Sequence, residues 1–265
     1  MRKFALLGIV GAVASAANAQ LIVGFDDTSA GVITCYEVRV SDGTNVATPL
    51  FSDIEVWALA SDNVNRKLYI GSGSLLYVYD GSGSPTLVGN FNFEGTTQSI
   101  VGMAFADGNL YVTKNISNEA VYKVNPATGE MTIALDYTDA DYDFGGFDYD
   151  NGSFYGANDD TTPFGSGLFS IDLGGTITKI ASYPAGETDI DGLAVGGGIA
   201  YLIEDEPGLT IHRYDLGSNS YLSPITSPFG TSEIFSAGAY APWIPAPGVA
   251  SIFCVAGLGA LRRRR

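Results

Sequence analysis

The feature that most constrains the fold of this chain is a repeat that covers most of its 265 residues. Short segments of small and apolar residues recur, and their first residues are 46, 44, 46 and 44 positions apart. They begin at Ile54, Ile100, Phe144, Ile190 and Ile234. Small apolar segments of this kind suit strands in a crowded interior, so the sequence predicts one structural unit that is repeated around or along a common core.

Each repeat contains further short segments in which aromatic and β-branched residues alternate with polar ones. Second segments lie at residues 68–70, 110–112, 154–155 and 200–202, and third segments at 77–80, 122–125, 169–172 and 212–215. Alternation with a period of two indicates strands, and the Asp, Asn and Gly residues at 107–109 and 150–152 suit tight hairpin turns. Four short strands in each unit of about 40–50 residues are typical of a β-propeller, with a solenoid as the alternative.

The two ends of the repeat predict how the ring closes. The chain after Gln20 enters at a second strand, residues 21–25, and the first strand of that unit is missing there. Residues 234–239, near the C-terminus, have the sequence of a first strand. We therefore predict an all-β fold, a five-bladed β-propeller in which the C-terminal strand closes the first blade and leaves no open edge.

The first 19 residues have the pattern of a Sec-type signal peptide. Arg2 and Lys3 form a basic start, residues 4–13 are apolar, and Ala17 and Ala19 provide a small-x-small cleavage site. We expect cleavage after Ala19, so that the mature chain begins at Gln20. The predicted domains are the signal peptide at 1–19, the propeller at 20–243 and a C-terminal segment at 244–265.

The C-terminal segment has three parts. Residues 245–248 read Pro-Ala-Pro-Gly, residues 249–261 are almost wholly apolar, and residues 262–265 are four arginines. The apolar part is about 13 residues long, which is shorter than the ~20 residues of a spanning helix. This order resembles the PEP-CTERM type of bacterial sorting signal, with alanine in place of the usual central glutamate. The resemblance implies processing by an exosortase-like enzyme after transient membrane contact, while an ordinary tail anchor is the alternative.

Charge limits the partners of the propeller. The two end segments hold six of the 13 basic residues and none of the 29 acidic ones, which leaves 7 basic residues against 29 acidic ones, a net charge of −22. A body of this charge repels nucleic acids and anionic lipids and attracts cations such as Ca²⁺. We therefore expect no nucleic-acid partner. Solubility is the simpler explanation for the acidity.

Four acidic residues recur just before the first segments of the repeat, at Asp53, Asp143, Asp189 and Glu233, with Ser99 at the remaining position. In a closed ring these positions form a circle near one mouth of the axial channel. Converging carboxylates suit Ca²⁺ or the hydroxyls of a polyol. We take these four residues as the candidate metal ligands, with turn capping as the competing interpretation.

Other acidic residues give weaker signals. The alternating acids Asp136, Asp139, Asp141 and Asp143 resemble a calcium loop but lack the glycine and the terminal glutamate of an EF-hand. The acids at 159–160 and 204–206 are interpreted as solvated turns.

The single histidine limits the chemistry of the chain. His212 stands where the other repeats have Tyr36, Tyr77, Tyr122 and Phe169, so it is interpreted as a packing ring. One histidine cannot supply a histidine cluster, which argues against zinc, haem and Ser-His-Asp chemistry.

Two function classes follow from these observations. The body is similar in pattern to extracellular propellers with YVTN, NHL or gluconolactonase-like repeats. The first hypothesis is a surface- or matrix-associated module that binds an extracellular polysaccharide or a surface protein without catalysis. The alternative is a Ca²⁺-dependent, lactonase-like hydrolase that uses the axial carboxylates, since such sites hold their ion on the axis.

Overall fold

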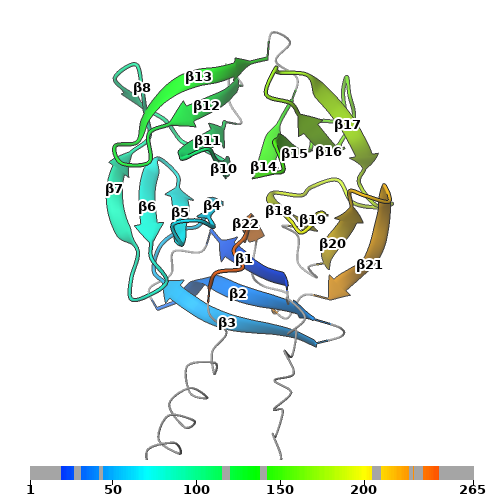
Figure 1. The fold of residues 1–265 in the computed structure, drawn as a ribbon, viewed down its shortest axis with the longest axis horizontal. Coiled ribbons are helices and arrows are strands. Elements are labelled where there is room, and N and C mark those ends of the chain that lie inside the picture. Colours follow the sequence, from blue (N-terminus) through cyan, green and yellow to red (C-terminus); the bar gives the residue numbers. More distant parts are fainter. Residues whose placement is uncertain are drawn as a thin grey trace, which may run out of the picture.

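The chain folds as a ring of five sheets. The computed structural model describes residues 19–26, 31–41, 44–114, 120–137, 142–204, 210–226, 229 and 235–244. Within these residues every regular element is a strand, and the strands form five sheets around a central axis (Figure 1). The five-bladed β-propeller predicted from the repeat is therefore confirmed. The described residues contain no helix of the length and apolarity needed to cross a membrane.

The four main strands of each blade form an antiparallel sheet whose first strand lies nearest the axis. Blade 1 consists of β22 (Phe235–Tyr240), β1 (Ala19–Phe25), β2 (Ile33–Ser41) and β3 (Thr44–Ser52), and blade 2 of β4 (Ala58–Asp62), β5 (Lys67–Ser72), β6 (Leu75–Tyr79) and β7 (Thr86–Asn90). Blade 3 consists of β10 (Gly102–Ala106), β11 (Asn109–Thr113), β12 (Ala120–Val124) and β13 (Glu130–Asp136), and the hairpin of β8 (Asn92–Phe93) and β9 (Thr96–Thr97) extends its outer edge by parallel pairing of β8 with β13. Blade 4 consists of β14 (Phe144–Asp150), β15 (Ser153–Asn158), β16 (Gly167–Ile171) and β17 (Ile177–Ser182), and blade 5 of β18 (Gly192–Gly196), β19 (Ile199–Ile203), β20 (Thr210–Asp215) and β21 (Ser220–Thr226).

The turns between inner and second strands have the predicted backbone conformation. Asp107 and Gly108 have φ values of 49° and 78°, and Asn151 and Gly152 have 49° and 90°. Two successive positive φ values define the tight hairpin turn whose twist matches that of the strands it joins. Asp, Asn and Gly are the residues that accept these angles most readily, so the local sequence sets these hairpins.

The C-terminal strand closes blade 1, as the sequence predicts. Strand β22 pairs antiparallel with β1, with Leu21 opposite Tyr240 and Ile22 opposite Ala239. In Figure 1 this strand, in orange, lies at the centre of the ring beside β1, in blue. The Asn63 amide in blade 2 also donates a 3.2 Å hydrogen bond to the Tyr240 carbonyl. Residues from the two ends of the chain thus share one sheet.

The hydrophobic core is divided among the interfaces between neighbouring blades. Five buried clusters occur, one at each interface. Between blades 3 and 4, Phe144, Phe147, Phe154 and Phe169 are each at most 2% exposed. Burial of one such side chain contributes about 1.5–3 kcal/mol. Every blade therefore depends on both of its neighbours for stability.

The described fold extends to Ile244. This residue is buried in the cluster between blades 1 and 2, and the Trp243 indole N–H donates a 2.8 Å hydrogen bond to the Ser61 hydroxyl. The predicted domain limits at residues 19 and 243 remain predictions, and residues 1–18 and 245–265 lie outside the described part of the chain.

Candidate functional site: an acidic cavity on the axis

A cavity of about 330 Å³ lies at the end of the axis where the inner strands begin. Four of its lining residues occupy one equivalent position of the strand register in four blades: Trp57, Val101, Gly145 and Asp191. The lining consists of Asp26, Trp57, Val101, Asp143, Gly145, Asp159, Asp189 and Asp191. Five of these eight residues are aspartates.

Small residues close the axis beneath this cavity. The space between the inner strands measures only about 10 Å³. A Cβ atom on Gly102 would stand 2.7 Å from the Phe147 Cβ, and one on Gly146 would stand 2.8 Å from the Leu193 Cβ. Glycine is required where backbones approach this closely. The cavity is therefore blind and does not continue as a channel through the ring.

The structure brings two of the four predicted metal ligands together. Asp143 and Asp189 both line the cavity. Asp53 does not: its carboxylate accepts hydrogen bonds from the Gly31 N–H and the Ser52 hydroxyl in an exposed turn. The hydrogen bonds from Ser52 and Gly31 lower the pKa of Asp53. Glu233 lies outside the described residues.

The strand register explains why Asp53 is elsewhere. In the ladders between inner and second strands, Ala58 of blade 2 occupies the place of Gly102 in blade 3 and Gly192 in blade 5. Counting back three residues from these positions makes Glu55 the equivalent of Ser99 and Asp189. Asp53 precedes that position by two residues and therefore caps a turn between blades 1 and 2.

Three further aspartates of the cavity were not among the ligands predicted from the sequence. Asp26 follows the second strand of blade 1, Asp159 follows the second strand of blade 4, and Asp191 directly precedes β18. A second strand runs antiparallel to its inner strand, so its end returns to the same mouth of the ring. Asp159, interpreted from the sequence as part of a solvated turn, instead faces this cavity. The signal that marks it is the shared position of Asp26 and Asp159 after second strands.

Three of the carboxylates are close enough to share one cation. Asp159, Asp189 and Asp191 each offer an oxygen, and these oxygens all lie within 4.8 Å of one another. Asp159 Oδ1 accepts hydrogen bonds from the Tyr183 hydroxyl at 3.0 Å and the Ile190 N–H at 3.2 Å. These bonds fix the carboxylate at the mouth of blade 4.

The pKa values of Asp159 and Asp143 are raised by burial and by neighbouring carboxylates. Burial, followed by the charge of Asp191, raises the pKa of Asp159 to about 8, although the Ile190 and Tyr183 hydrogen bonds oppose the shift. Burial, followed by the charges of Asp160 and Asp189, raises the pKa of Asp143. Like charges at short range disfavour ionisation, and a bound cation removes that penalty.

The lining defines what the cavity can hold. Carboxylate oxygens are the ligands that Ca²⁺ prefers, and the described lining residues include no lysine, arginine or histidine that would neutralise them. Trp57 adds an aromatic surface at the same mouth. The cavity therefore fits a divalent cation, or the hydroxyls of a polyol together with such a cation.

The two described residues of the other acidic cluster, Asp136 and Asp143, lie in different surroundings. Asp136 is exposed at the end of β13, whereas Asp143 lies on the axis. Asp139 and Asp141 lie outside the described residues.

Fold and cavity together define a class: a five-bladed β-propeller with an acidic, blind axial pocket. Within that class, the chain belongs to the family described as a repeat of unknown function (DUF6923), whose model matches residues 56–202, more than half of the chain. No curated protein matches the sequence.

The solved structures that resemble this one come from proteins of different kinds. A chain of a nidogen/laminin complex has a TM-score of 0.59 at 11% identity, over 84% of this chain and 98% of that chain. TolB from Acinetobacter baumannii has a TM-score of 0.53 at 11% identity, over 84% and 66%. A gluconolactonase from Xanthomonas campestris, XC5397, has a TM-score of 0.52 at 15% identity, over 81% and 78%. At these identities the likeness concerns the fold alone.

Proposed function

We propose that this protein is an exported, surface- or matrix-associated β-propeller that binds its ligand without catalysis, through a Ca²⁺ ion held in the axial cavity. The observation that carries the proposal is the convergence of five aspartates on one blind cavity whose described lining has no cationic side chain. Calcium that is held by three or four carboxylates keeps coordination positions open for oxygen atoms of a ligand. Vicinal hydroxyls of an extracellular polysaccharide supply such oxygens, and Trp57 offers a face against which a sugar ring can stack.

The proposed location rests on the two ends of the sequence. Residues 1–19 have the features of a signal peptide, and residues 244–265 resemble a sorting signal that an exosortase-like enzyme processes. Cleavage after Ala19 would remove only the first residue of β1. Intact-mass measurement of protein from the native cell tests both ends: the expected species begins at Gln20 and lacks Arg265. Retention of Arg265 would contradict the interpretation of residues 244–265 as a processed sorting signal and favour a tail anchor.

Thermal melting with and without Ca²⁺ tests the cavity. We expect millimolar Ca²⁺ to raise the Tm, because an ion that binds only the folded state stabilises it by mass action. The double variant D159N/D191N should lose this rise, since it removes two of the three converging carboxylates. D53N is the matched control, because Asp53 lies outside the cavity, and it should keep the rise. An unchanged Tm in Ca²⁺ for the unaltered chain would contradict the proposal.

Ligand binding is measured next. A glycan array probed in Ca²⁺ and in EDTA should show Ca²⁺-dependent binding that D159N/D191N abolishes. Glycan binding that persists in the double variant would place the glycan on another surface, whereas a lack of binding to any glycan by the unaltered chain would favour a protein partner.

A second candidate is a Ca²⁺-dependent, lactonase-like hydrolase. It is favoured by the trio of Asp159, Asp189 and Asp191, whose oxygens lie close enough together to hold the cation that such a reaction needs. Hydrolysis of sugar lactones by the Ca²⁺-loaded chain, lost in D159N, would select this function over simple binding.

A further inference from the structure

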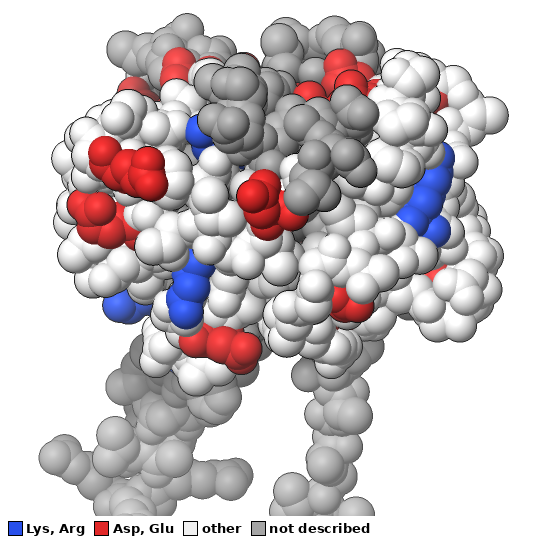
Figure 2. Space-filling model, turned by 90° about the horizontal axis from the view of Figure 1, so that it is seen from above, with Lys and Arg blue, Asp and Glu red and all other residues white. Residues whose placement is uncertain are grey.

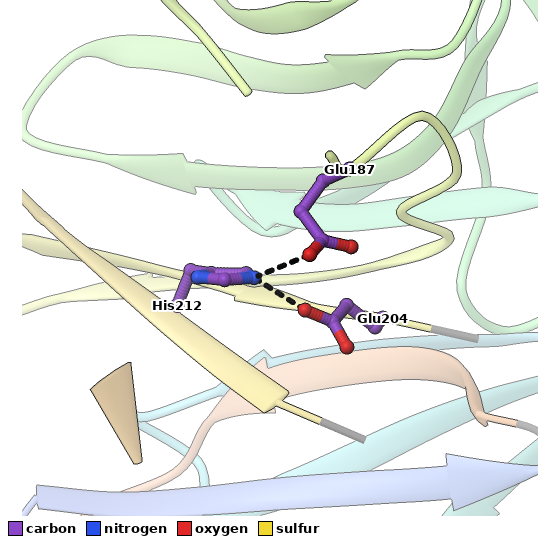
Figure 3. Close-up of side chains that lie close together, drawn as sticks. All are labelled: Glu187, Glu204 and His212. Atoms are coloured by element: carbon purple, nitrogen blue, oxygen red, sulfur yellow. Dashed lines mark hydrogen bonds and ion pairs between the residues drawn. The ribbon is translucent and has the colours of Figure 1, made fainter. Parts of the chain in front are cut away.

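The second cluster of ionisable side chains lies in blade 5, away from the axial cavity. His212 is on β20, Glu204 directly follows β19, and Glu187 lies in the segment between β17 and β18. Figure 3 shows both glutamates pointing at the same ring nitrogen, His212 Nε2. Glu204 Oε1 hydrogen-bonds to this nitrogen, and Glu187 Oε1 lies 3.9 Å from it.

The other four blades show that this cluster is not required by the fold. The ladders between second and third strands place Tyr36, Tyr77, Tyr122, Phe169 and His212 at one equivalent position, opposite Val23, Ile70, Val112, Gly156 and Leu202. Four blades fill it with a six-membered aromatic ring. The residue equivalent to Glu204 is Phe25, Ser72, Lys114 or Asn158. Of the five blades, only blade 5 therefore pairs an imidazole with a carboxylate here.

Burial of the His212–Glu204 pair costs free energy, which points to a role that offsets this cost. His212 and Glu204 are 9% and 6% exposed. Moving an ionisable pair out of water costs desolvation energy that an apolar ring at the same place would not. Packing alone therefore does not account for the change of both residues in one blade. Two carboxylates also face one ring nitrogen, which can donate only one proton, so a hydrogen bond to His212 accounts for only one of them.

We propose that Glu187, Glu204 and His212 form a binding site for a transition-metal cation of the Zn²⁺ class. The single histidine argued against zinc in the sequence, but two glutamates complete the set here: one imidazole nitrogen and two carboxylate oxygens are ligands that Zn²⁺ accepts. Three protein ligands leave the fourth position for water. The donor atoms all lie within 4.8 Å of one another. Ca²⁺ prefers oxygen ligands only, so the site differs in chemistry from the axial cavity.

The surroundings of the cluster suit such a site. The second oxygen of Glu204, Oε2, accepts a 2.9 Å hydrogen bond from the Thr210 N–H, which fixes the carboxylate as outer-shell hydrogen bonds do in metal sites. The Glu187 side chain is 29% exposed, so an ion can enter on this side. Glu187 precedes Asp189 by two residues, so a bound ion would fasten the segment that carries two of the axial aspartates.

Competition with a chromophoric chelator tests the site in the full-length protein. We expect one equivalent of Zn²⁺ to bind at neutral pH and to raise the Tm. H212F copies the residue that blade 4 has at this position, so it should fold while losing at least tenfold in Zn²⁺ affinity. E187Q changes a partly exposed side chain and should weaken binding without loss of the fold, which keeps the test valid if H212F fails to fold.

Two controls separate this site from others. D53N removes a carboxylate from an exposed turn between blades 1 and 2 and should leave Zn²⁺ binding unchanged. Y77H places an imidazole at the equivalent position of blade 2, where Ser72 replaces the glutamate, and should add no second equivalent. The proposal is overturned if the unaltered chain binds no Zn²⁺, or if H212F and E187Q bind it as tightly as the unaltered chain.

Discussion

The carboxylate of Asp148 accepts a 2.6 Å hydrogen bond from the backbone N–H of Val195, which ties the inner strand of blade 4 to that of blade 5. Its other oxygen accepts a 2.8 Å hydrogen bond from the Tyr149 N–H. Burial raises the pKa of Asp148 to about 8, although these two hydrogen bonds oppose the shift. The equivalent position is alanine in the other blades, at Ala60, Ala104, Ala194 and Ala239. Asp148 is thus a polar link between two neighbouring blades.

Removing this link should destabilise the ring. We expect D148A to lower the free energy of unfolding by about 1–3 kcal/mol at pH 6, because the Val195 N–H loses its partner in a buried place. Urea denaturation followed by tryptophan fluorescence measures the change. D150A, on the same strand but with a half-buried side chain bonded to Asn151, is the control and should change stability by less than about 0.5 kcal/mol. An equal loss of unfolding free energy in both variants would contradict a specific role of Asp148 in linking the two blades.

Stability should fall with rising pH because of Asp159. Its pKa of about 8 in the folded chain lies above the value of roughly 4 expected when unfolded. Between these two values the folded state binds a proton that the unfolded state does not, so the free energy of unfolding decreases as pH rises from about 4 to 8. Comparing urea melts of the unaltered chain and D159N at pH 5.5, 7 and 8.5 isolates this contribution. Parallel pH profiles for the two proteins would argue against the raised pKa.

Calcium should oppose this loss. Because Ca²⁺ competes with the proton on Asp159, the rise in Tm caused by Ca²⁺ should be larger at pH 8.5 than at pH 5.5. A Ca²⁺ effect independent of pH would place the ion away from Asp159.

The closing strand should be essential to the whole domain. Deleting residues 234–240 removes β22, which pairs with β1 and lines the axis with the inner strands of its neighbours. We expect the truncated chain to unfold or aggregate, since the edge of β1 and the adjoining cores become exposed. A chain that ends after Ile244 is the control and should melt like the full-length protein. A cooperative, unchanged melt after the internal deletion would show that blade 1 does not need the closing strand.

The glycine layer beneath the cavity should tolerate no side chain. A Cβ on Gly102 would stand 2.4 Å from Thr113 Oγ1 and 2.8 Å from the Gly145 carbonyl. We therefore expect G102A to lower the free energy of unfolding by about 1–3 kcal/mol. At Gly174 the added Cβ meets only the Asp172 side chain, at 3.2 Å, so G174A should have little effect. Equal Tm values for the two variants would contradict the close packing at the axis.

The local sequence accounts for most of the fold. Period-two alternation marks strands, and pairs such as Asp107 and Gly108 set the hairpins, because both are decided by residues adjacent in the chain. The closure of blade 1 was also predictable. The N-terminal unit lacks a first strand and the C-terminal end has an additional one, so pairing the two completes the ring. The proposed metal ligands Asp143 and Asp189 were found because they keep the same distance from their inner strands.

The site was only partly predictable, because it depends on register and on contacts across blades. A shift of two residues leaves every side chain on the same face of a strand, so alternation cannot decide whether Asp53 or Glu55 is the equivalent of Asp189. The ladder between β4 and β5 makes that choice. Similarly, His212 was interpreted as a packing ring because its repeat-equivalents are aromatic, and only the folded blade places Glu204 and Glu187 against it.

Sequence alone therefore determined that this chain forms a closed ring of five four-stranded units, because strand period, turn residues and repeat spacing are local properties. Tertiary structure decided which carboxylates meet. Asp26, Asp159 and Asp191 come from three different blades, and they face one cavity only because the ring closes with the ends of second strands and the starts of inner strands at the same mouth. The repulsion between Asp159 and Asp191, and the raised pKa of Asp159, exist only in the folded ring, since residues so far apart in the sequence do not interact in the unfolded chain.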